Sequence, residues 1–549
     1  MKIVLAQLNF HIGNFTSNAN KMIKSINQAK GEGADLVVFS ELAVCGYPPY
    51  DFLERKEFIQ QCSDAIQDIA KECKGIAAIV GGPEINPEPQ GKNLFNAAYL
   101  LEDGQIKQTI RKTLLPNYDV FDEYRYFQPN SEFELITIKG KKIALTICED
   151  IWDDQPVANA FARDKLYTLS PMDKLMQQEP DLAINIAASP FSYTQVDIRR
   201  DIVRNKARQY KIPFIYVNQV GANTELIFDG NSMAVNSRGD ITHQSNAFQE
   251  DHVVVDMAEL EVKNTVAPEV TTPIQLIYDA LVVGVRDYFA KMGFTKTTLG
   301  LSGGIDSAVT VAIAAEALGK ENVRVLLLPS QYSSDHSIND AVDLANNLGI
   351  EYNIVPIKEI FNSYNFLMSP IFEGTESDVT EENMQARIRG TLLMALSNKF
   401  GHILLNTSNK SEAAVGYGTL YGDMNGGISV LGDVYKTDVF KLARYINRQQ
   451  EVIPENTIVK PPSAELRPDQ KDSDSLPDYD VLDGILFRYI EKNMSPEEIM
   501  NDGFEEATVN KAVRLVNMNE YKRFQTAPTL RISSKAFGIG RRMPLVAKY

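Results

Sequence analysis

Three residues in the first 150 have the types and positions that amide hydrolysis requires. Glu41 follows the β-branched run 36–40, Lys112 precedes a proline-containing loop, and Cys148 follows the run 142–147. α/β folds place catalytic groups at the ends of strands. A thiol with a pKa of about 8.5 is mostly protonated at pH 7, so a nearby base and cation must activate it. We predict Cys148 as nucleophile, Glu41 as general base and Lys112 as support for the oxyanion.

Each of these residues also has an ordinary explanation. A single cysteine at the end of a strand is more often a small core residue. A glutamate or a lysine beside a loop is usually solvated. Their order along the chain and the residues that surround them favour the catalytic interpretation.

A second candidate site begins at a glycine-rich loop between a predicted strand and a predicted helix. The two glycines at 303–304 let the backbone approach an anion closely, and Ser302 and Ser307 add hydroxyl donors. The start of the following helix adds partial positive charge. The pattern differs from a Walker A loop. We predict an ATP-binding loop that consists of Gly300, Leu301, Ser302, Gly303, Gly304, Ile305, Asp306 and Ser307.

Carboxylates and a lysine further along the chain suit the same polyphosphate chemistry. Asp306, Glu412 and Asp423 are hard oxygen ligands of the kind that Mg²⁺ prefers. Lys436 can neutralise negative charge on the phosphates. Any one of them alone is more often a solvated loop charge. Together they predict a magnesium-dependent site with ATP as co-substrate.

Short β-branched runs, each followed by a polar turn and a helix-like stretch, repeat through the first 260 residues. This alternation is typical of a layered α/β fold, which positions the three catalytic candidates at strand ends. We predict strands at 2–6, 36–39, 77–80, 142–147, 182–186, 214–218 and 253–255.

A second α/β unit follows a stretch rich in valine, threonine and proline, which we interpret as an extended linker over 263–273. A helix over 274–292 opens this unit. The segment 468–483 is rich in Asp, Ser and Pro and is predicted to be a mobile loop. The last residues, 519–549, carry seven Lys or Arg against one Glu. We predict strands at 297–301, 323–328, 352–355 and 402–406.

The composition argues against several classes of protein. The net charge of −17 and the pI near 5.0 argue against binding of nucleic acid or of an anionic membrane, because both need a basic surface. No run reads as a signal peptide or a membrane span. Four cysteines without a CxxC pair, and five scattered histidines, predict neither disulfides nor a zinc site. We predict a cytoplasmic enzyme with small-molecule partners.

Four stretches of the first half resemble the signature blocks of the nitrilase (carbon–nitrogen hydrolase) superfamily. The resemblance covers about residues 1–260 and implies an α-β-β-α sandwich that holds the three catalytic candidates. It also implies that Tyr118 and Ser189 bind glutamine. Related glutaminase domains usually have a lysine six residues after this serine, where this chain has Gln195. The four stretches are 39–42, 112–123, 148–152 and 188–191.

The SGGxDS string resembles the pyrophosphate loop of the N-type ATP pyrophosphatases, which implies a Rossmann-like domain with a parallel sheet. That family cleaves ATP between the α and β phosphates to adenylate an oxygen. The residues downstream resemble one subfamily, the NAD synthetases. There the equivalents of Glu412 and Asp423 are associated with magnesium, and that of Thr407 with ATP. The strings 382–390 and 519–523 resemble the segments beside the deamido-NAD site, which implies that Asn383 and Lys522 bind this substrate. The resemblance to the subfamily gives Glu412 the same role.

The two resemblances occur in the order found in glutamine-dependent NAD synthetases. They imply an amidase domain over 1–262, the linker, and a synthetase domain over 274–549. The implied reaction takes ammonia from glutamine and uses ATP to amidate deamido-NAD, which gives NAD, glutamate, AMP and pyrophosphate. A homo-oligomer is expected.

Two alternatives remain at this stage. The first is another amidotransferase, in which the same ATP loop serves a different acceptor, such as a purine nucleotide. Asn383, Lys522 and the strings around them argue against it. The second is a nucleotide-sensing or scaffold protein with an inactive nitrilase domain. The presence of every expected nucleophile, base and metal ligand argues against that.

Overall fold

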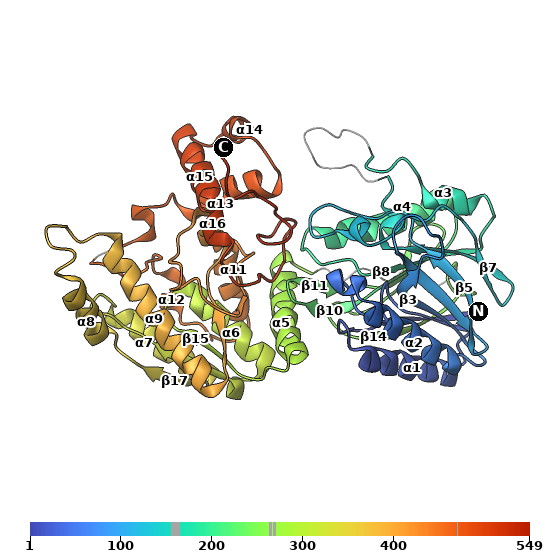
Figure 1. The fold of residues 1–549 in the computed structure, drawn as a ribbon, viewed down its shortest axis with the longest axis horizontal. Coiled ribbons are helices and arrows are strands. Elements are labelled where there is room, and N and C mark those ends of the chain that lie inside the picture. Colours follow the sequence, from blue (N-terminus) through green and yellow to red (C-terminus); the bar gives the residue numbers. More distant parts are fainter. Residues whose placement is uncertain (155–164, 263–265, 267–270, 469, 549) are drawn as a thin grey trace. The chain divides into compact units, whose positions relative to one another are not determined.

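In the computed structural model the chain forms two compact units, Met1–Val270 and Thr271–Tyr549. The structure describes all residues except 155–164, 263–265, 267–270, 469 and 549 (Figure 1). The predicted linker 263–273 therefore falls largely outside the described residues. Helix α5 begins at Pro273, after Thr272 caps it by accepting from Gln275 N–H.

The first unit contains two six-stranded sheets and a two-stranded hairpin. Its strands are β1 Lys2–Gln7, β2 Leu36–Val38, β3 Ala77–Ile85, β4 Leu94–Glu102, β5 Gln105–Arg111, β6 Ile136–Ile138, β7 Lys141–Ile147, β8 Leu182–Ala187, β9 Phe214–Asn218, β10 Val220–Asn223, β11 Leu226–Asp229, β12 Met233–Val235, β13 Ile241–Gln244 and β14 Asp251–Asp256. The sheet orders are β14-β1-β2-β3-β4-β5 and β13-β12-β9-β8-β7-β6, and β10 pairs with β11. Every strand predicted in this unit is present, and the antiparallel strands β4, β5, β6 and β10–β13 are additional.

Alternate residues of β1 show how these layers pack. Val4 and Ala6 share a buried core with Met22 of helix α1 (Phe15–Gly31), whereas Ile3 and Leu5 share a core with strand β7 of the other sheet. Side chains alternate between the two faces of a strand, so the first sheet has helices on one face and the second sheet on the other. Helix α2 packs beside α1 on the same face of the first sheet, and α3 and α4 cover the outer face of the second sheet (Figure 1). The result is the predicted α-β-β-α sandwich. These helices are α2 Lys56–Glu72, α3 Pro171–Met176 and α4 Gln195–Tyr210.

The second unit is built on one parallel sheet with the order β17-β16-β15-β18-β19. Its strands are β15 Thr297–Gly300, β16 Val323–Leu327, β17 Glu351–Ile354, β18 Ile403–Asn406 and β19 Ile428–Ser429. The strand order reverses at β15, and ligands of open α/β sheets bind at the carboxyl ends of strands beside such a reversal. The sheet thus matches the predicted Rossmann-like domain and indicates where its site lies.

Helices surround this sheet and extend beyond it (Figure 1). Helix α6 starts immediately after β15, and α10 follows β18, so the amino-terminal ends of both helices face the reversal point. The helices are α5 Pro273–Met292, α6 Ile305–Leu318, α7 Asp335–Leu348, α8 Lys358–Met368, α9 Val379–Phe400, α10 Lys410–Val415, α11 Lys436–Ile446, α12 Glu455–Val459, α13 Tyr479–Leu486, α14 Pro496–Asn501, α15 Glu506–Met518 and α16 Glu520–Arg523. None of the helices in the described parts of the chain combines the length and apolar character needed to cross a bilayer.

The predicted mobile loop over 468–483 is wrong at its carboxyl end, because helix α13 starts at Tyr479. The acidic residues that suggested a solvated loop have partners inside the unit. Asp472 accepts from the hydroxyls of Tyr417 and Tyr479, at 3.1 and 2.9 Å. Asp483 accepts from the Ser411 hydroxyl and from the N–H of Thr437. Composition alone does not show that these charges are buried.

Two candidate active sites

The strand–turn junction at Cys148 places a buried nucleophile on a strained backbone. Strand β7 ends at Ile147, and Cys148 opens a 3₁₀ turn with φ of +45°, a region that non-glycine residues rarely adopt. The Asp150 carboxylate holds the turn by accepting from the N–H of Ile147 at 3.0 Å. Its other oxygen accepts from the N–H groups of Thr113 and Leu114 at 3.0 and 2.8 Å. Asp150 thereby ties the backbone beside Lys112 to the backbone beside Cys148.

Lys112, directly after β5, lies fully buried between two carboxylates. Its ammonium donates to Glu41 Oε1 at 2.7 Å and to both oxygens of Glu123, at 2.9 and 2.8 Å. The Glu41 carboxylate is fixed on both sides. Asn96 Nδ2 donates to its Oε1 at 2.7 Å, and the N–H of Ala188 donates to its Oε2 at 3.0 Å. The structure thus brings the predicted base and cation into direct contact.

Glu123 is a functional candidate that the sequence reasoning did not single out. It belongs to a short 3₁₀ turn, is almost fully buried, and accepts from the Tyr47 hydroxyl at 3.0 Å in addition to Lys112. Burial foremost, together with the Glu41 charge, raises the pKa of Glu123 to about 7, against the opposing charge of Lys112. The only signal in the sequence is its place at the end of the 112–123 block.

The charges around the thiol keep it protonated at rest. Burial raises the pKa of Cys148 well above its ordinary value, the Glu41 charge raises it further, and Lys112 opposes both. Burial alone would lower the pKa of Lys112, but the carboxylates of Glu123 and Glu41 raise it well above the ordinary value. The resting set is therefore a neutral thiol beside a protonated lysine. Such a set can transfer the thiol proton to a carboxylate when a substrate carbon approaches.

The predicted glutamine-binding residues lie at different parts of this site. Tyr118 donates its hydroxyl to Glu149, the residue after the nucleophile, at 2.8 Å. Ser189 follows Ala188, whose N–H holds Glu41, and its own N–H donates to Asn218 Oδ1 at 2.9 Å. Gln195 is the first residue of α4, where its N–H donates to Ser192 O.

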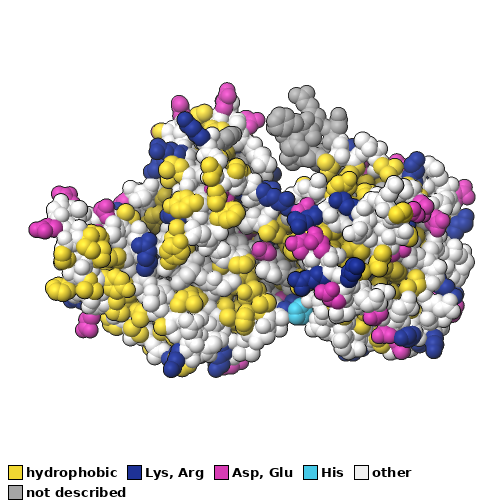
Figure 2. Space-filling view, in the orientation of Figure 1, with side chains coloured by type: hydrophobic (Ala, Val, Ile, Leu, Met, Phe, Trp, Pro, Cys, Tyr) yellow, Lys and Arg dark blue, Asp and Glu magenta, His cyan; other side chains and the backbone are white. Residues whose placement is uncertain are grey.

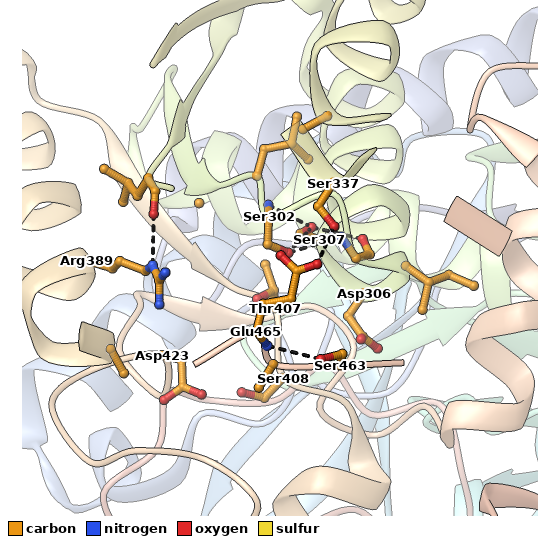
Figure 3. Close-up of a pocket in the computed structure, with 18 of the residues that line it drawn as sticks. Ser302, Asp306, Ser307, Ser337, Arg389, Thr407, Ser408, Asp423, Ser463 and Glu465 are labelled. Carbon is orange, nitrogen blue, oxygen red and sulfur yellow. Dashed lines mark hydrogen bonds between the residues drawn. The ribbon is translucent and has the colours of Figure 1, made fainter. Parts of the chain in front are cut away.

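The second unit has a cavity of about 320 Å³ at the carboxyl edge of its sheet (Figure 3). Gly303 does not line it. Gly303 has φ of +80°, and a Cβ there would collide with the Ser337 backbone of α7, so this position needs glycine. Predicted site residues that do line it are Gly300, Leu301, Ser302, Gly304, Ile305, Asp306, Ser307, Thr407, Glu412, Asp423 and Lys436.

The loop that closes this edge of the sheet is organised by its own serines. The hydroxyls of Ser302 and Ser307 lie 3.1 Å apart, and Ser302 Oγ accepts from the N–H of Gly304 at 3.2 Å. Helix α6 starts at Ile305, so the amides of its first turn lack partners within the helix. This is the arrangement in which a helix amino terminus binds a phosphate.

Asp306 and Glu412 meet on one lysine. Lys436 Nζ lies 2.5 Å from Asp306 Oδ2 and 3.3 Å from Glu412 Oε1. Burial, and then the neighbouring Asp306 charge, raise the pKa of Glu412 to about 8, and Lys436 opposes them. Asp423 lies elsewhere on the cavity wall, where it accepts from the N–H of Thr419 at 2.6 Å. Among the described residues no three Asp, Glu, His or Cys side chains form a group that could hold a metal ion.

Asn383 and Lys522, far apart in the sequence, converge on the loop 416–423. Asn383 Oδ1, on α9, accepts from the Thr419 hydroxyl at 2.7 Å. Lys522 Nζ, on α16, donates to the carbonyls of Gly416 and Gly418 at 2.8 Å each. Burial lowers the pKa of Lys522, although the Asp423 charge opposes this. Cavity residues that the sequence reasoning did not assign include Arg389, Tyr417, Lys460, Glu465 and Asp472.

Comparison with known proteins identifies a family for each half of the chain. Residues 2–265 match the Carbon-nitrogen hydrolase family, and residues 277–526 match the NAD synthase family. A glutamine-dependent NAD(+) synthetase of Synechocystis sp. is 50% identical over 100% of this chain and 99% of its own length. One of Thermotoga maritima is 41% identical over 100% of this chain and 99% of its own length.

A solved structure shares the fold along the whole chain. It is a glutamine-dependent NAD+ synthetase of Acinetobacter baumannii in complex with adenosine diphosphate, with 41% identity, 99% and 98% coverage of the two chains, and a TM-score of 0.78. Full-length similarity at this level, with both catalytic units in the same order, decides the family. The chain belongs to the glutamine-dependent NAD+ synthetases.

Proposed function

We propose that this chain amidates deamido-NAD to NAD in an ATP-dependent reaction, with ammonia that it releases from glutamine. The observation that carries the proposal is the pairing, in one chain, of a buried Cys148–Glu41–Lys112 site with a cavity formed around the Ser302–Ser307 loop. The first arrangement suits amide hydrolysis through a thioester, and the second suits cleavage of ATP. An inactive nitrilase domain is disfavoured because the catalytic network is complete.

In the first site, Glu41 takes the thiol proton as Cys148 Sγ attacks the amide carbon of glutamine. The ammonium of Lys112 stabilises the tetrahedral oxyanion. When the intermediate collapses, Glu41 returns the proton to the departing ammonia, and a thioester remains. Water then hydrolyses the thioester to glutamate. Glu123 keeps Lys112 protonated through these steps, because its carboxylate lies 2.8 Å from the ammonium.

We assign recognition of glutamine to Tyr118, Ser189 and Gln195. Tyr118 supports this assignment because it donates to Glu149, the residue after the nucleophile. Ser189 supports it because it follows Ala188, whose N–H donates to the base Glu41. Gln195 stands where related domains usually have a lysine. We propose that its side-chain amide contacts the substrate glutamine in place of the lysine ammonium. Removal of the amide in Gln195→Ala is expected to raise the KM for glutamine.

In the second site, a carboxylate oxygen of the nicotinate ring attacks the α phosphorus of ATP, and pyrophosphate leaves with the electrons of the broken bond. Ammonia then attacks the acyl carbon and AMP leaves. The Ser302–Ser307 loop with the start of α6 binds the departing pyrophosphate, and Thr407 binds ATP. The ammonium of Lys436 exchanges its two carboxylate partners for phosphate oxygens, whose charge it neutralises. Support comes from the relative of A. baumannii, whose structure contains adenosine diphosphate.

The donor set of this cavity fits Mg²⁺. Mg²⁺ is usually held by one or two carboxylates together with phosphate oxygens, and Asp306 and Glu412 are such a pair, with Asp423 as a third candidate. Burial, and after it the Asp306 charge, disfavour the ionised form of Glu412 and raise its pKa to about 8, and a bound cation would offset both effects. When bound, the ion supplies charge neutralisation to the polyphosphate. A Glu412→Gln variant with unchanged magnesium dependence would contradict this assignment.

We assign binding of deamido-NAD to Glu412, which lines the cavity, and to Asn383 and Lys522, which do not line it but hold the neighbouring loop 416–423. The convergence of Asn383 and Lys522 on the loop 416–423 supports this, because that loop also carries Asp423 on the cavity wall. Lys522→Met should raise the KM for deamido-NAD and leave hydrolysis of glutamine intact, whereas truncation after Tyr521 would also remove the buried residues Leu530 and Ile532.

A homo-oligomer is part of the proposal. Large apolar side chains are exposed on α8 and on the segment that leads to α9, including Phe366, Leu367 and Ile371 at 70–78% (Figure 2). Apolar patches of this kind mark interaction surfaces, and we propose that a second copy covers this one. Phe366→Glu places a charge in this patch and should therefore lower the molecular mass that sedimentation measures, from that of the oligomer to that of a single chain. The cytoplasmic location stays a prediction from the scattered cysteines.

The test is an assay with deamido-NAD, ATP, Mg²⁺ and glutamine, in which NAD, AMP, pyrophosphate and glutamate are measured together. The proposal requires NAD, AMP and pyrophosphate in equal amounts, with at least as much glutamate. Formation of glutamate without NAD, while a purine nucleotide acceptor restores the release of AMP, would favour an amidotransferase with a different acceptor.

A further inference from the structure

Three cations line the cavity of the second unit, and one of them lacks an acidic partner. Lys436 is paired with Asp306 and Glu412, and Lys460 lies 2.8 Å from Asp340. Arg389, on α9, has no carboxylate within ion-pair distance among the residues that the structure describes. An unpaired cation in a partly closed cavity is costly unless a ligand supplies the opposite charge.

A hydrogen bond to the backbone fixes the orientation of the Arg389 guanidinium. Its Nε donates to the carbonyl of Leu328, just beyond the end of β16, at 2.9 Å (Figure 3). This bond uses one edge of the planar group and leaves both terminal nitrogens without a protein partner in the described structure. Burial lowers the pKa of Arg389 to about 10, although Asp423 and Glu465 oppose this, so the group stays charged at pH 7.

The position of Arg389 separates it from the other phosphate-binding groups. The Ser302–Ser307 loop and the start of α6 serve the pyrophosphate end of ATP, with Lys436 beside them. Arg389 is attached to the carbonyl of Leu328, where the apolar side chains of Leu326, Leu327 and Leu393 line the wall. A flat apolar base fits that wall. In ATP the ribose and the α-phosphoryl group lie between the base and the pyrophosphate, and of these two only the α-phosphoryl group is an anion that a guanidinium would pair with.

We infer that Arg389 binds the α-phosphoryl group of ATP and keeps it through the adenylated intermediate to AMP. This inference rests on the proposed function and assigns a new residue to it. A guanidinium suits this task because its parallel N–H donors match two phosphoryl oxygens. In the reaction, the carboxylate oxygen bonds to the α phosphorus as the bond to pyrophosphate breaks. The two non-bridging oxygens that Arg389 holds take no part in bond making.

The test compares binding of AMP with binding of adenosine to the full chain by titration calorimetry. The two ligands differ only in the phosphate. Arg389→Met keeps most of the side-chain length and removes the charge, so it should weaken AMP binding roughly tenfold to hundredfold and leave adenosine unchanged. Arg389→Lys keeps the charge but lacks the parallel N–H donors of the guanidinium, so its affinity for AMP should lie between those of the wild type and Arg389→Met. The matched control is Lys399→Met at the exposed end of the same helix, which should bind both ligands normally.

Three results would overturn the inference. An equal loss of AMP and adenosine binding in Arg389→Met would assign the residue to the base or ribose. Unchanged AMP binding would leave it no role in holding the phosphate. A wild-type chain that binds AMP no more tightly than adenosine would also contradict it. None of these outcomes depends on NAD formation, so failure of the inference is separable from failure of the proposed function. Circular dichroism and the Arg389→Lys variant guard against a misfolded Met variant.

Discussion

Each unit of this protein holds a lysine between two carboxylates, yet the two lysines are built for opposite tasks. Lys112 has no exposed surface, and its contacts with Glu41 and Glu123 measure 2.7–2.9 Å. Lys436 opens onto a cavity, and its two contacts are unequal, 2.5 Å to Asp306 and 3.3 Å to Glu412. The first network is complete before the substrate arrives. The second must exchange carboxylates for phosphates, and its long contact with Glu412 is the one that a phosphate would replace most easily.

The largest effect is expected from the nucleophile of the closed network. Cys148→Ala removes the only atom that can form the thioester, so hydrolysis of glutamine and glutamine-driven NAD formation should both fall to background. Release of glutamate from glutamine, followed over hours at high enzyme concentration, measures this. Residual turnover above a mock preparation would assign the nucleophile to another group.

The two lysines should differ next in their contribution to stability. Lys112→Met leaves two buried carboxylates without a counter-charge, which should lower the free energy of unfolding of the first unit by about 3–5 kcal/mol. Lys436→Met should lower that of the second unit by only about 1–2 kcal/mol, because the cavity lets water reach Asp306 and Glu412. Calorimetry of both variants measures the difference, and equal losses would contradict the contrast between closed and open networks.

The thiol should be alkylated with a pH dependence that follows from its surroundings. Burial and the Glu41 charge raise the pKa of Cys148, so the thiolate fraction should rise about tenfold per pH unit through pH 7 to 9 without levelling off. Peptide mass spectrometry after iodoacetamide treatment gives the rate at this residue. Glu41→Gln removes the second cause and should speed the reaction at each pH. A plateau below pH 8 would show a thiolate at rest.

The smallest effect should come from the edge of the glutamine site. Tyr118→Phe removes one of two phenol donors to Glu149 and leaves that of Tyr167, at 2.9 Å. The loss of one hydrogen bond should cost about 1 kcal/mol, which appears as a roughly fivefold rise in the KM for glutamine. NAD formation from ammonium should not change. A similar loss with ammonium would place Tyr118 outside the glutamine site.

The contrast also explains what could be predicted from the sequence. Glu41, Cys148 and the Ser302–Ser307 loop follow strands that were predicted from local runs, such as 142–147 before Cys148. Strands β4 and β5 were not predicted, although β5 positions Lys112. β4 pairs with β3 and β5 pairs with β4, both antiparallel, and β5 is only half-buried, so its sequence lacks a continuous apolar run.

Residues whose role depends on a distant partner were the hardest to predict. Glu123 becomes part of the first site only because the fold brings Tyr47 and Asn96 against it. The sequence around Asp472 suggests a solvated loop charge, whereas in the structure Asp472 accepts hydrogen bonds from Tyr417 and Tyr479. No spacing in the sequence shows these contacts.

The most direct test of two separate networks is the nitrogen source that each lysine variant can use. Lys112→Met and Lys436→Met are each assayed for NAD formation with glutamine and with high ammonium, and for glutamate release. The account predicts that Lys112→Met loses the glutamine reaction and keeps the ammonium reaction, which rises with pH as free ammonia increases. Lys436→Met should lose synthesis with either source and still release glutamate. Loss of the ammonium reaction in a folded Lys112→Met variant would contradict the account.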